Sequence, residues 1–539
     1  MLALALAGAL VLAACGDDGD DNTTSAGGRS DVSATPAPSA SGGAATTTAE
    51  ADDVDPNGVL RIGTAVSSPN VWDNFDLPTL AVPPVDVHRA VYGTLLRQHE
   101  DGSLHPGLAE AVTVVDPSTL RVVLRPGVRF TDGTPYDAEA VKFGLERHVA
   151  AANARAFAAE LQQIDTMTVD DPLTLTITLK RPIAGYIQVL FARGESSIPS
   201  PTAVRNGVDL KTTPVGAGPF VLDTVVPNQL IRIVKNPDYI DADEVRLAAV
   251  EYVVLSGEPL TMSNAVRSGA VDVVHLGSPT LELLEGLGNS VASRFEVTDS
   301  VLLWGQLRKT NPPLDDVRVR QALNFGIDRD AINQALFQGQ SEPAMGFLRS
   351  SSPNFDPALA DYWTHDVERA KALLAEAGVT ELTIEGYAAA GLGQRFAEIV
   401  QQQWQDIGVN LEIRSSQQVV QDFFIDGKGD INFYGMVNPP LQGIQRNLQP
   451  GTIGNVGSWS HDEVNALVAE LQALPPDSPQ AVQPWRRLQK VILDQAPNVF
   501  GVFGMKAAAW RDERVGDVSW VLEYNGGPFI DLQRVYIRT

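Results

Sequence analysis

The residue whose position most clearly suggests chemistry is Cys15, the single cysteine in a chain of 539 residues. It ends the run of residues 2–14, which holds only Leu, Ala, Val and Gly, and acidic residues follow it. Three uses compete for such a thiol: a core residue, a reactive nucleophile or a processing site. One cysteine excludes an internal disulfide framework and any zinc or iron–sulfur site built from several thiolates.

The apolar run before Cys15 is too short to cross a membrane, because a spanning helix needs about 20 residues. Its length and its small residues are typical of the hydrophobic region of a signal peptide. The stretch LAAC (12–15) resembles the lipobox of bacterial lipoproteins. That resemblance implies that residues 1–14 are a signal peptide and that Cys15 carries the lipid which anchors the protein to a membrane. An ordinary hydrophobic N-terminus is the alternative.

A tether and a long body follow Cys15. Residues 15–56 are rich in Gly, Asp, Ser, Thr, Ala and Pro, so they cannot bury enough apolar surface to fold and are expected to form a disordered tether. The whole chain is 44% hydrophobic, and the part after the tether is long enough for two or three domains. A net charge of −26 argues against nucleic acid and anionic lipid head groups as broad partners.

Strand and helix signals alternate through the body, which predicts an α/β protein. Asp132–Gly133 marks a tight turn, and Asp137 is the expected N-cap of a helix with Val141, Leu145 and His148 on its inner face. A second helix is expected from Asp366 as N-cap to Gly378 as the stop, with Val367, Ala370, Leu374 and Ala377 as its apolar stripe. Trp404 lies on the inner face of a third expected helix and is assigned to the core.

Six stretches occur in an order that resembles one protein family. They are LHPGLAEAVTVVDPSTLRVVLRPGVRFTDGTPYDAEAVKFGLER (104–147), TPVGAGPF (213–220), VKNPDYI (234–240), AVRSGAVDVV (265–274), NPPLDDVRVRQALNFGIDRDAI (311–332) and HDVERAKALLAEAG (365–378). This order resembles the family 5 extracellular solute-binding proteins, the dipeptide, oligopeptide and nickel receptors of ABC importers.

The resemblance implies a two-lobed type II periplasmic-binding-protein fold, α/β in class. The first lobe would hold residues 57–303, with an extra subdomain near 100–205, and the second lobe residues 304–504. Residues 505–539 would return to the first lobe, with hinges near Trp304 and Gly504. The implied protein is a monomeric receptor without a cofactor. It binds a small or peptide-like solute between its lobes and passes it to the permease and ATPase subunits of an importer.

The same resemblance places the receptor on the extracytoplasmic face of the cell membrane. A ligand-sensing or chaperone-like lipoprotein on the same fold is an alternative. An extracellular hydrolase is the other alternative, but the sequence has neither G-x-S-x-G nor H-E-x-x-H, and its histidines are scattered without metal-ligand spacing.

Most charged residues of the matching stretches are expected to be structural. Asp315 and Asp316 precede a helix and are N-cap candidates, while Arg318 and Arg320 are expected to pair with acids. The glycines of GAGP (216–219) form a tight turn rather than a phosphate loop, because no Lys-Ser/Thr pair follows them.

The expected ligand region lacks the usual acid. In peptide-binding relatives, an acidic residue in a stretch like G-W-x-A-D-Y pairs with the free amine of the peptide. Here, residues 431–461 contain no Asp or Glu, and Arg446 is their only Lys or Arg. A buried ammonium without a carboxylate would be costly. We therefore expect a neutral or anionic ligand, or a blocked peptide.

The expected ligand contacts come from aromatic, amide and guanidinium side chains, which combine flat apolar surface with polar groups. Arg308 could hold a carboxylate or phosphate in bidentate fashion, or it could be a solvated hinge arginine. The five candidates are Trp304, Tyr434, Asn438, Trp72 and Arg308.

Overall fold

The structure is a computed structural model, and all the residues that it describes belong to one unit, Ala49–Thr539. The described residues are 53–65, 75–76, 85–99, 103–150, 158–194, 197–256, 259–277, 287, 291–388, 391–416, 418–437, 439–452, 454–475, 478–522 and 528–539. Cys15, Trp72 and Asn438 lie outside these ranges, so their predicted roles stay predictions.

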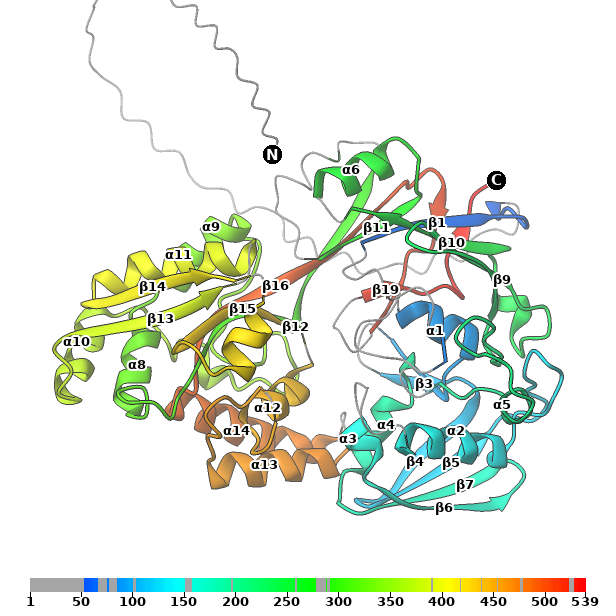
Figure 1. Ribbon diagram of the computed structural model, residues 1–539, viewed down its shortest axis with the longest axis horizontal. Helices are drawn as coiled ribbons and strands as arrows, with labels where there is room; N and C mark the ends of the chain where they lie inside the picture. Colours follow the sequence, from blue (N-terminus) through cyan, green and yellow to red (C-terminus); the bar gives the residue numbers. More distant parts are fainter. Residues whose placement is uncertain are drawn as a thin grey trace, which may run out of the picture. The chain divides into compact units, whose positions relative to one another are not determined.

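A ten-stranded sheet runs through the unit (Figure 1). Its strands, in spatial order, are β14 (Val409–Ser415), β13 (Leu382–Ala388), β15 (Ile431–Val437), β12 (Ala292–Leu307), β16 (Asn498–Trp510), β11 (Val273–Gly277), β1 (Val59–Ala65), β10 (Ala249–Leu255), β9 (Leu230–Lys235) and β8 (Phe220–Val226). β12 and β16 are the long strands of this sheet, and they pair antiparallel with each other.

Strand β16 contributes to two large hydrophobic cores, and a smaller third cluster gathers around Val266. One core is built from residues between Leu60 and Val273 together with Ala508 and residues between Val515 and Ile537. The second core spans Leu302 to Met505. The β12–β16 pairing is irregular between Thr298 and Leu302. On β16, the change of core lies between Met505, which is buried in the second core, and Ala508, which is buried in the first. The mixed α/β class predicted from the sequence is confirmed by this architecture.

Smaller sheets complete the part built on the first core. The four-stranded sheet has the order β4 (Ala109–Asp116), β5 (Thr119–Leu124), β7 (Thr174–Leu179) and β6 (Ile164–Asp171). The two-stranded sheets are β2 (Leu96–Gln98) with β3 (Leu104–Pro106), β17 (Val515–Gly516) with β20 (Tyr536–Ile537), and β18 (Trp520–Leu522) with β19 (Pro528–Ile530).

Most helices divide between the two large cores in chain order. The first part carries α1 (Val85–Tyr92), α2 (Ala138–Ala150), α3 (Ala158–Leu161), α4 (Ala184–Leu190), α5 (Pro201–Arg205) and η3 (Ala242–Glu244). Helix α6 (Pro259–Arg267) follows them and buries its apolar residues in the smaller third cluster. The second part carries α8 (Val317–Phe325), α9 (Arg329–Phe337), η4 (Pro357–Leu359), α10 (Val367–Glu376), α11 (Leu392–Gln405), η5 (Val420–Ile425), α12 (Pro440–Leu448), α13 (Asp462–Ala473), η6 (Pro479–Ala481) and α14 (Val482–Gln495).

The predicted helix signals are confirmed in detail. Asp137 accepts a hydrogen bond from the Ala140 N–H at 2.9 Å, and Asp366 accepts one from the Arg369 N–H at 2.9 Å. Gly378 follows α10 with a φ of 74°, a backbone conformation that glycine adopts without strain. Trp404 is fully buried and donates its indole N–H to the Leu323 carbonyl at 3.0 Å, as expected for a core residue.

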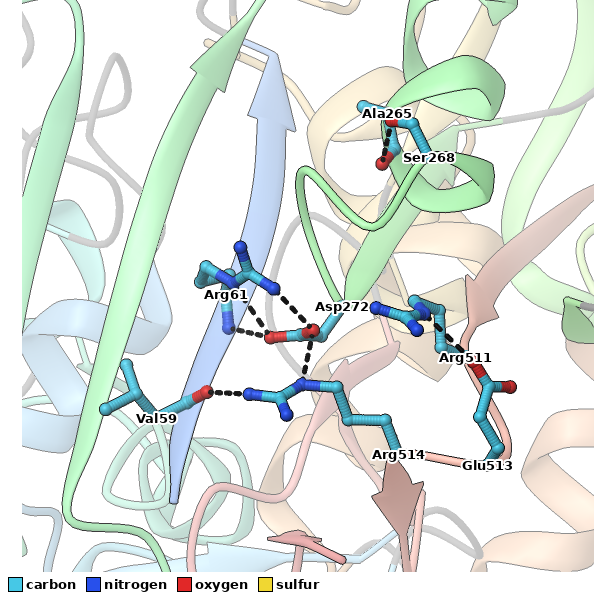
Figure 2. Close-up of polar contacts among 8 residues, drawn as sticks. All are labelled: Val59, Arg61, Ala265, Ser268, Asp272, Arg511, Glu513 and Arg514. Atoms are coloured by element: carbon cyan, nitrogen blue, oxygen red, sulfur yellow. Dashed lines mark hydrogen bonds and ion pairs between the residues drawn. The ribbon is translucent and has the colours of Figure 1, made fainter. Parts of the chain in front are cut away.

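Asp272 joins the early strands to the end of the chain (Figure 2). Its side chain is fully buried and accepts from the backbone N–H of Arg61 at 2.9 Å. The Arg61 guanidinium lies 3.1 Å from the same carboxylate, and Arg514 Nε donates to it at 2.8 Å. Asp272, the Asp of the stretch AVRSGAVDVV (265–274), therefore connects β1 and β11 to the segment that follows β16.

The body begins earlier than the sequence predicts. The Asp55 N–H donates to the Ile537 carbonyl at 2.8 Å, Val54 bridges to Arg538, and Arg538 forms an ion pair with Asp53. Residues 53–55, which composition assigns to the tether, are therefore held by the last residues of the chain.

Candidate functional site: a cavity between two hydrophobic cores

Trp304 stands in a row of aromatic side chains that crosses three strands. It pairs with Tyr434 on β15 and with Phe500 on β16, and the ring centroids lie 5.8 and 6.5 Å apart. Phe347 packs edge-on against Trp304, with centroids 5.5 Å apart. Trp304 is fully buried, so its place here is to support Tyr434, and direct contact with a ligand stays a prediction.

Tyr434 is half-buried at the edge of this row. Its hydroxyl lies 3.3 Å from Asn447 Oδ1 on α12, and the same oxygen accepts from Gln306 Nε2 at 3.0 Å. Burial raises the pKa of the Tyr434 hydroxyl, so the group stays a neutral hydrogen-bonding partner. Tyr434 thus combines a partly exposed ring with a fixed hydroxyl, and its role in ligand contact remains a proposal.

Arg308 is engaged by the chain itself. Its Nε donates to the Gly429 carbonyl at 2.9 Å and its Nη2 to the Phe423 carbonyl at 2.7 Å. The guanidinium also lies over the Phe423 ring, 4.7 Å from its centroid. Burial lowers the pKa of Arg308, but the guanidinium of arginine remains charged. In this structure, Arg308 holds the segment that contains η5 against the end of β12.

The charged residues of the stretch 311–332, which follows Arg308, form structural contacts. Arg318 forms the expected ion pair with Asp316, which also caps α8. The expectation that Arg320 pairs with an acid was wrong, because this buried side chain donates to backbone carbonyls, including those of Gln495 at 2.9 Å and Leu314 at 2.8 Å. Burial lowers the pKa of Arg320 to about 10.

The GAGP stretch, which is predicted to form a tight turn, packs closely against α1. The Gly218 N–H donates to the Val91 carbonyl at 3.0 Å, and the Ala217 N–H donates to the Tyr92 carbonyl at 3.2 Å. A Cβ atom at Gly216 would lie 2.5 Å from Tyr92 Cα, closer than real Cβ atoms approach. The stretch therefore seats its backbone directly on the end of α1.

A cavity of about 250 Å³ lies where α4 meets the helices of the second core. From the first core it is lined by Gln98, Gly185, Tyr186, Val189 and Arg193. From the second core it is lined by Leu348, Ser352, Asn354, Pro439, Pro440, Leu441, Gln442, Leu471, Leu474, Pro475, Ala481 and Trp485. Aromatic and aliphatic surface with a few polar groups is the usual composition of a small-molecule site.

The cavity lining carries positive rather than negative charge. Arg193 is the only Lys or Arg among the described residues of the lining, and those residues include no Asp or Glu. Pro439, which belongs to the acid-free stretch 431–461, also lines the cavity. The electrostatics therefore favour a carboxylate or a neutral group over an ammonium.

The comparisons with known proteins agree with this architecture. Residues 103–445 match the family model of the bacterial extracellular solute-binding proteins, family 5. The chain belongs to this family. It is therefore a solute-binding receptor of ABC importers and not an enzyme. Receptors of this family are extracytoplasmic proteins.

Individual relatives cover most of the chain. The glutathione-binding protein GsiB of Shigella flexneri is 25% identical over 88% of this chain and 93% of its own. The structure of AgaA from A. tumefaciens R10 in complex with agropinic acid has a TM-score of 0.70 and 24% identity, covering 88% of this chain and 97% of that one. DppA from Helicobacter pylori in complex with the peptide STSA has a TM-score of 0.72 and 19% identity, over 90% and 99%. These neighbours confirm the two-lobed fold.

Two further findings concern membranes and metals. In the described ranges, no helix combines the length and the apolar character needed to span a bilayer. The same residues bring together no group of three or more His, Cys, Asp or Glu side chains suited to a metal ion.

Sequence reasoning missed the part of the cavity that comes from α4 and α14. The useful signal was a glycine inside an otherwise helical stretch, PIAGYIQVL (182–190), because a helix tolerates Gly at a cost that close packing can offset. Trp485 on α14 gave no comparable signal, since an aromatic residue on an amphipathic helix is typical of a core.

Proposed function

We propose that this chain is a lipid-anchored receptor which captures a small, peptide-like solute without a free amine and delivers it to the permease of an ABC importer. The observation that carries the ligand class is the absence of Asp and Glu from both residues 431–461 and the described lining of the cavity. An ammonium taken into such a site would lose its water and gain no counter-charge.

The positive charge of the lining supports the same ligand class. Arg193 is buried beside the cavity, and a guanidinium binds a carboxylate with two parallel hydrogen bonds where the geometry allows it. One structural neighbour supports an acidic ligand, since the structure of AgaA is a complex with agropinic acid. A short peptide with a blocked amine and a free carboxylate satisfies both conditions.

Matched ligands test the ligand class directly. Thermal unfolding of the chain from residue 15, with Cys15→Ser, is measured with alanyl-alanine, N-acetyl-alanyl-alanine and the amide of the latter. Because a ligand that binds only the folded state raises its stability, the acetylated acid should give the largest shift. Binding of the free-amine dipeptide tenfold tighter than its acetylated form, measured by calorimetry, would contradict the proposal.

The anchor is tested separately. If Cys15 carries lipid, Cys15→Ser should move the protein from the membrane fraction to the soluble fraction and leave ligand affinity unchanged. The nearby substitution Ser25→Ala is the control and should leave the protein in the membrane fraction. A Cys15→Ser protein that stays with the membrane would exclude lipidation as the main attachment.

The two-lobed fold supports the proposed delivery to a permease. A ligand that touches both halves stabilises one arrangement of them by its differential affinity, and a membrane partner can recognise that arrangement. Deletion of the receptor should therefore abolish uptake of the ligand identified by calorimetry. Normal uptake in a deletion strain that lacks other receptors for the same ligand would favour a sensing role.

A further inference from the structure

Gly185, in the first turn of α4, has no room for a side chain. An ideal Cβ atom placed on it would lie 2.5 Å from the Leu474 carbonyl carbon and 2.9 Å from Pro475 N, below the 3.0 Å that real Cβ atoms respect. All the crowding atoms belong to backbone, so no side-chain rotation could make space. Helix α4 and the end of α13 therefore touch main chain to main chain.

The two sides of this contact belong to different cores. Around Gly185, the α4 side chains of Ala184, Ile187 and Leu190 are buried in the first core. On the other side, Leu467 and Leu471 of α13 are buried in the second core. The contact thus joins two different core clusters, and among the described residues no buried side chain of α4 belongs to the cluster that contains α13.

The junction is also a wall of the candidate cavity. Gly185, Leu474 and Pro475 all line it, and Tyr186 and Leu471 line it next to them. A side chain at position 185 would force α4 and the backbone of residues 474–475 apart, because a Cβ atom there would lie within 3.0 Å of that backbone. The cavity would then open along this wall and lose the enclosure that buries a small ligand.

We propose that Gly185 is a positioning residue for ligand capture, because its missing side chain lets the two halves close main chain to main chain over the cavity. The ligand part of this inference rests on the proposed function. The geometric part, contact between α4 and α13 that depends on residue 185, does not.

A second crowded glycine, Gly144, provides a control that distinguishes an effect on the contact between the two halves from an effect on helix packing within one core. Gly144 in α2 is also crowded, but by the Ile198 side chain, which lies in the same core as α2. Replacing either glycine with Ala raises helix propensity. Only the Gly185 substitution is expected to change the distance between the two halves.

Spin labels measure this distance without a ligand. The chain from residue 15 with Cys15→Ser has no other cysteine, so Thr168→Cys on β6 and Glu470→Cys on α13 give two unique and exposed labelling sites. Molecules in which α4 and α13 are in contact should give a shorter distance between the labels than molecules in which they are apart. We expect the population with the shorter distance to fall at least threefold with Gly185→Ala and to vanish with Gly185→Leu. Gly144→Ala should keep the parental distribution.

Further variants keep the result interpretable if Gly185→Leu fails to fold. Leu474→Ala removes a side chain but leaves the backbone contact, so the parental label separations should remain. An unchanged distribution in a folded Gly185→Ala protein, or a shift as large with Leu474→Ala or Gly144→Ala, would overturn the proposal.

A binding measurement links closure to capture. With N-acetyl-alanyl-alanine as the probe, Gly185→Ala should weaken binding at least tenfold relative to Gly144→Ala. Equal affinities of the two variants would overturn the role in capture. If the parent protein itself does not bind the probe, the proposed ligand class fails, while the label distances still decide whether Gly185 controls closure.

Discussion

Arg514 reaches back across 242 residues to donate its Nε hydrogen to the buried carboxylate of Asp272 at 2.8 Å. Arg61 approaches the same carboxylate from β1 at 3.1 Å. One carboxylate thus fastens the first strand of the body and the last segment of the chain to β11. Arg514 also donates to the Val59 carbonyl at 3.5 Å (Figure 2), so Asp272 carries most, but not all, of this contact.

We expect Asp272→Asn to lower the free energy of unfolding by about 2 kcal/mol. Breaking a wholly buried pair costs about 3–5 kcal/mol, but here both arginines are about one-third exposed and screened by water. Urea unfolding measures the change. Glu412→Gln, which removes an exposed partner of Arg414, is the control and should change stability by less than about 0.5 kcal/mol.

Local signals predicted local structure well in this chain. The cap at Asp366 and the stripe with Ala370 and Leu374 are confirmed, because both depend on residues within one helix. Arg320 was misjudged because its acceptors include the carbonyl of Gln495, which is 175 residues distant and has no side-chain signature. Side-chain charges in the sequence cannot predict which backbone carbonyls will accept hydrogen bonds from a buried arginine.

The candidate site was predictable in part for the same reason. The acid-free stretch 431–461 was found from the sequence, and its residues 439–442 line the cavity, whereas Tyr434 is not among the lining residues and its ligand contact stays a prediction. The wall formed by Gly185 and Leu474 depends on how two different core clusters meet, and the sequence contains no periodic pattern for that contact. Only the glycine inside a helix indicated that another backbone comes close.

Lys309 should make stability depend on pH. Its side chain is 1% exposed, its Nζ has no hydrogen-bond partner among the described residues, and the Trp459 ring centroid lies 5.8 Å away. Burial, with smaller contributions from Arg320 and Arg308, lowers the pKa of Lys309 to about 7. The unfolded chain keeps a pKa of about 10.4, so between these values it holds a proton that the folded protein has released. Stability from this group therefore rises with pH over that window.

Lys309→Met tests this linkage. The variant should be more stable than the parent at pH 6, and its advantage should shrink as the pH rises from 7 to 10, by about 1.4 kcal/mol for each pH unit at most. Urea unfolding at pH 6, 7.5 and 9 measures the difference. Lys371→Met, at an exposed helix position, should show no such trend, and parallel pH profiles for parent and Lys309→Met would contradict the assignment.

Arg308→Ala should loosen the segment that carries η5. The substitution removes the donors to the carbonyls of Phe423 and Gly429, so amide hydrogen exchange at residues 423–429 should rise about tenfold. Arg318→Ala is the control, because Arg318 pairs with Asp316 and not with the η5 segment, and it should leave hydrogen exchange at residues 423–429 unchanged. Ligand affinity measured on the same protein distinguishes the two roles considered for Arg308. A loss greater than tenfold without a change in exchange would assign it to the ligand.

Pro439→Asp should create an anchor for a free amine at the cavity wall. Pro439 lines the cavity and occupies the N-cap of α12, where Asp and Asn are both well tolerated and where Pro donates no hydrogen bond. The fold should therefore survive either substitution. A carboxylate at this wall would supply the counter-charge for a free ammonium, and a charged hydrogen bond in a partly buried site contributes about 1.5–3 kcal/mol.

The comparison of Pro439→Asp with Pro439→Asn isolates that charge, since the two side chains have nearly the same shape. Alanyl-alanine should bind the Asp variant at least tenfold tighter than the Asn variant, and N-acetyl-alanyl-alanine should bind the Asp variant more weakly, because its carboxylate now meets a like charge. Calorimetry with both dipeptides measures the four affinities. If Asp and Asn variants bind the free-amine dipeptide equally, the absence of an acid at this wall is not what sets the ligand class, and selectivity must arise from another part of the cavity.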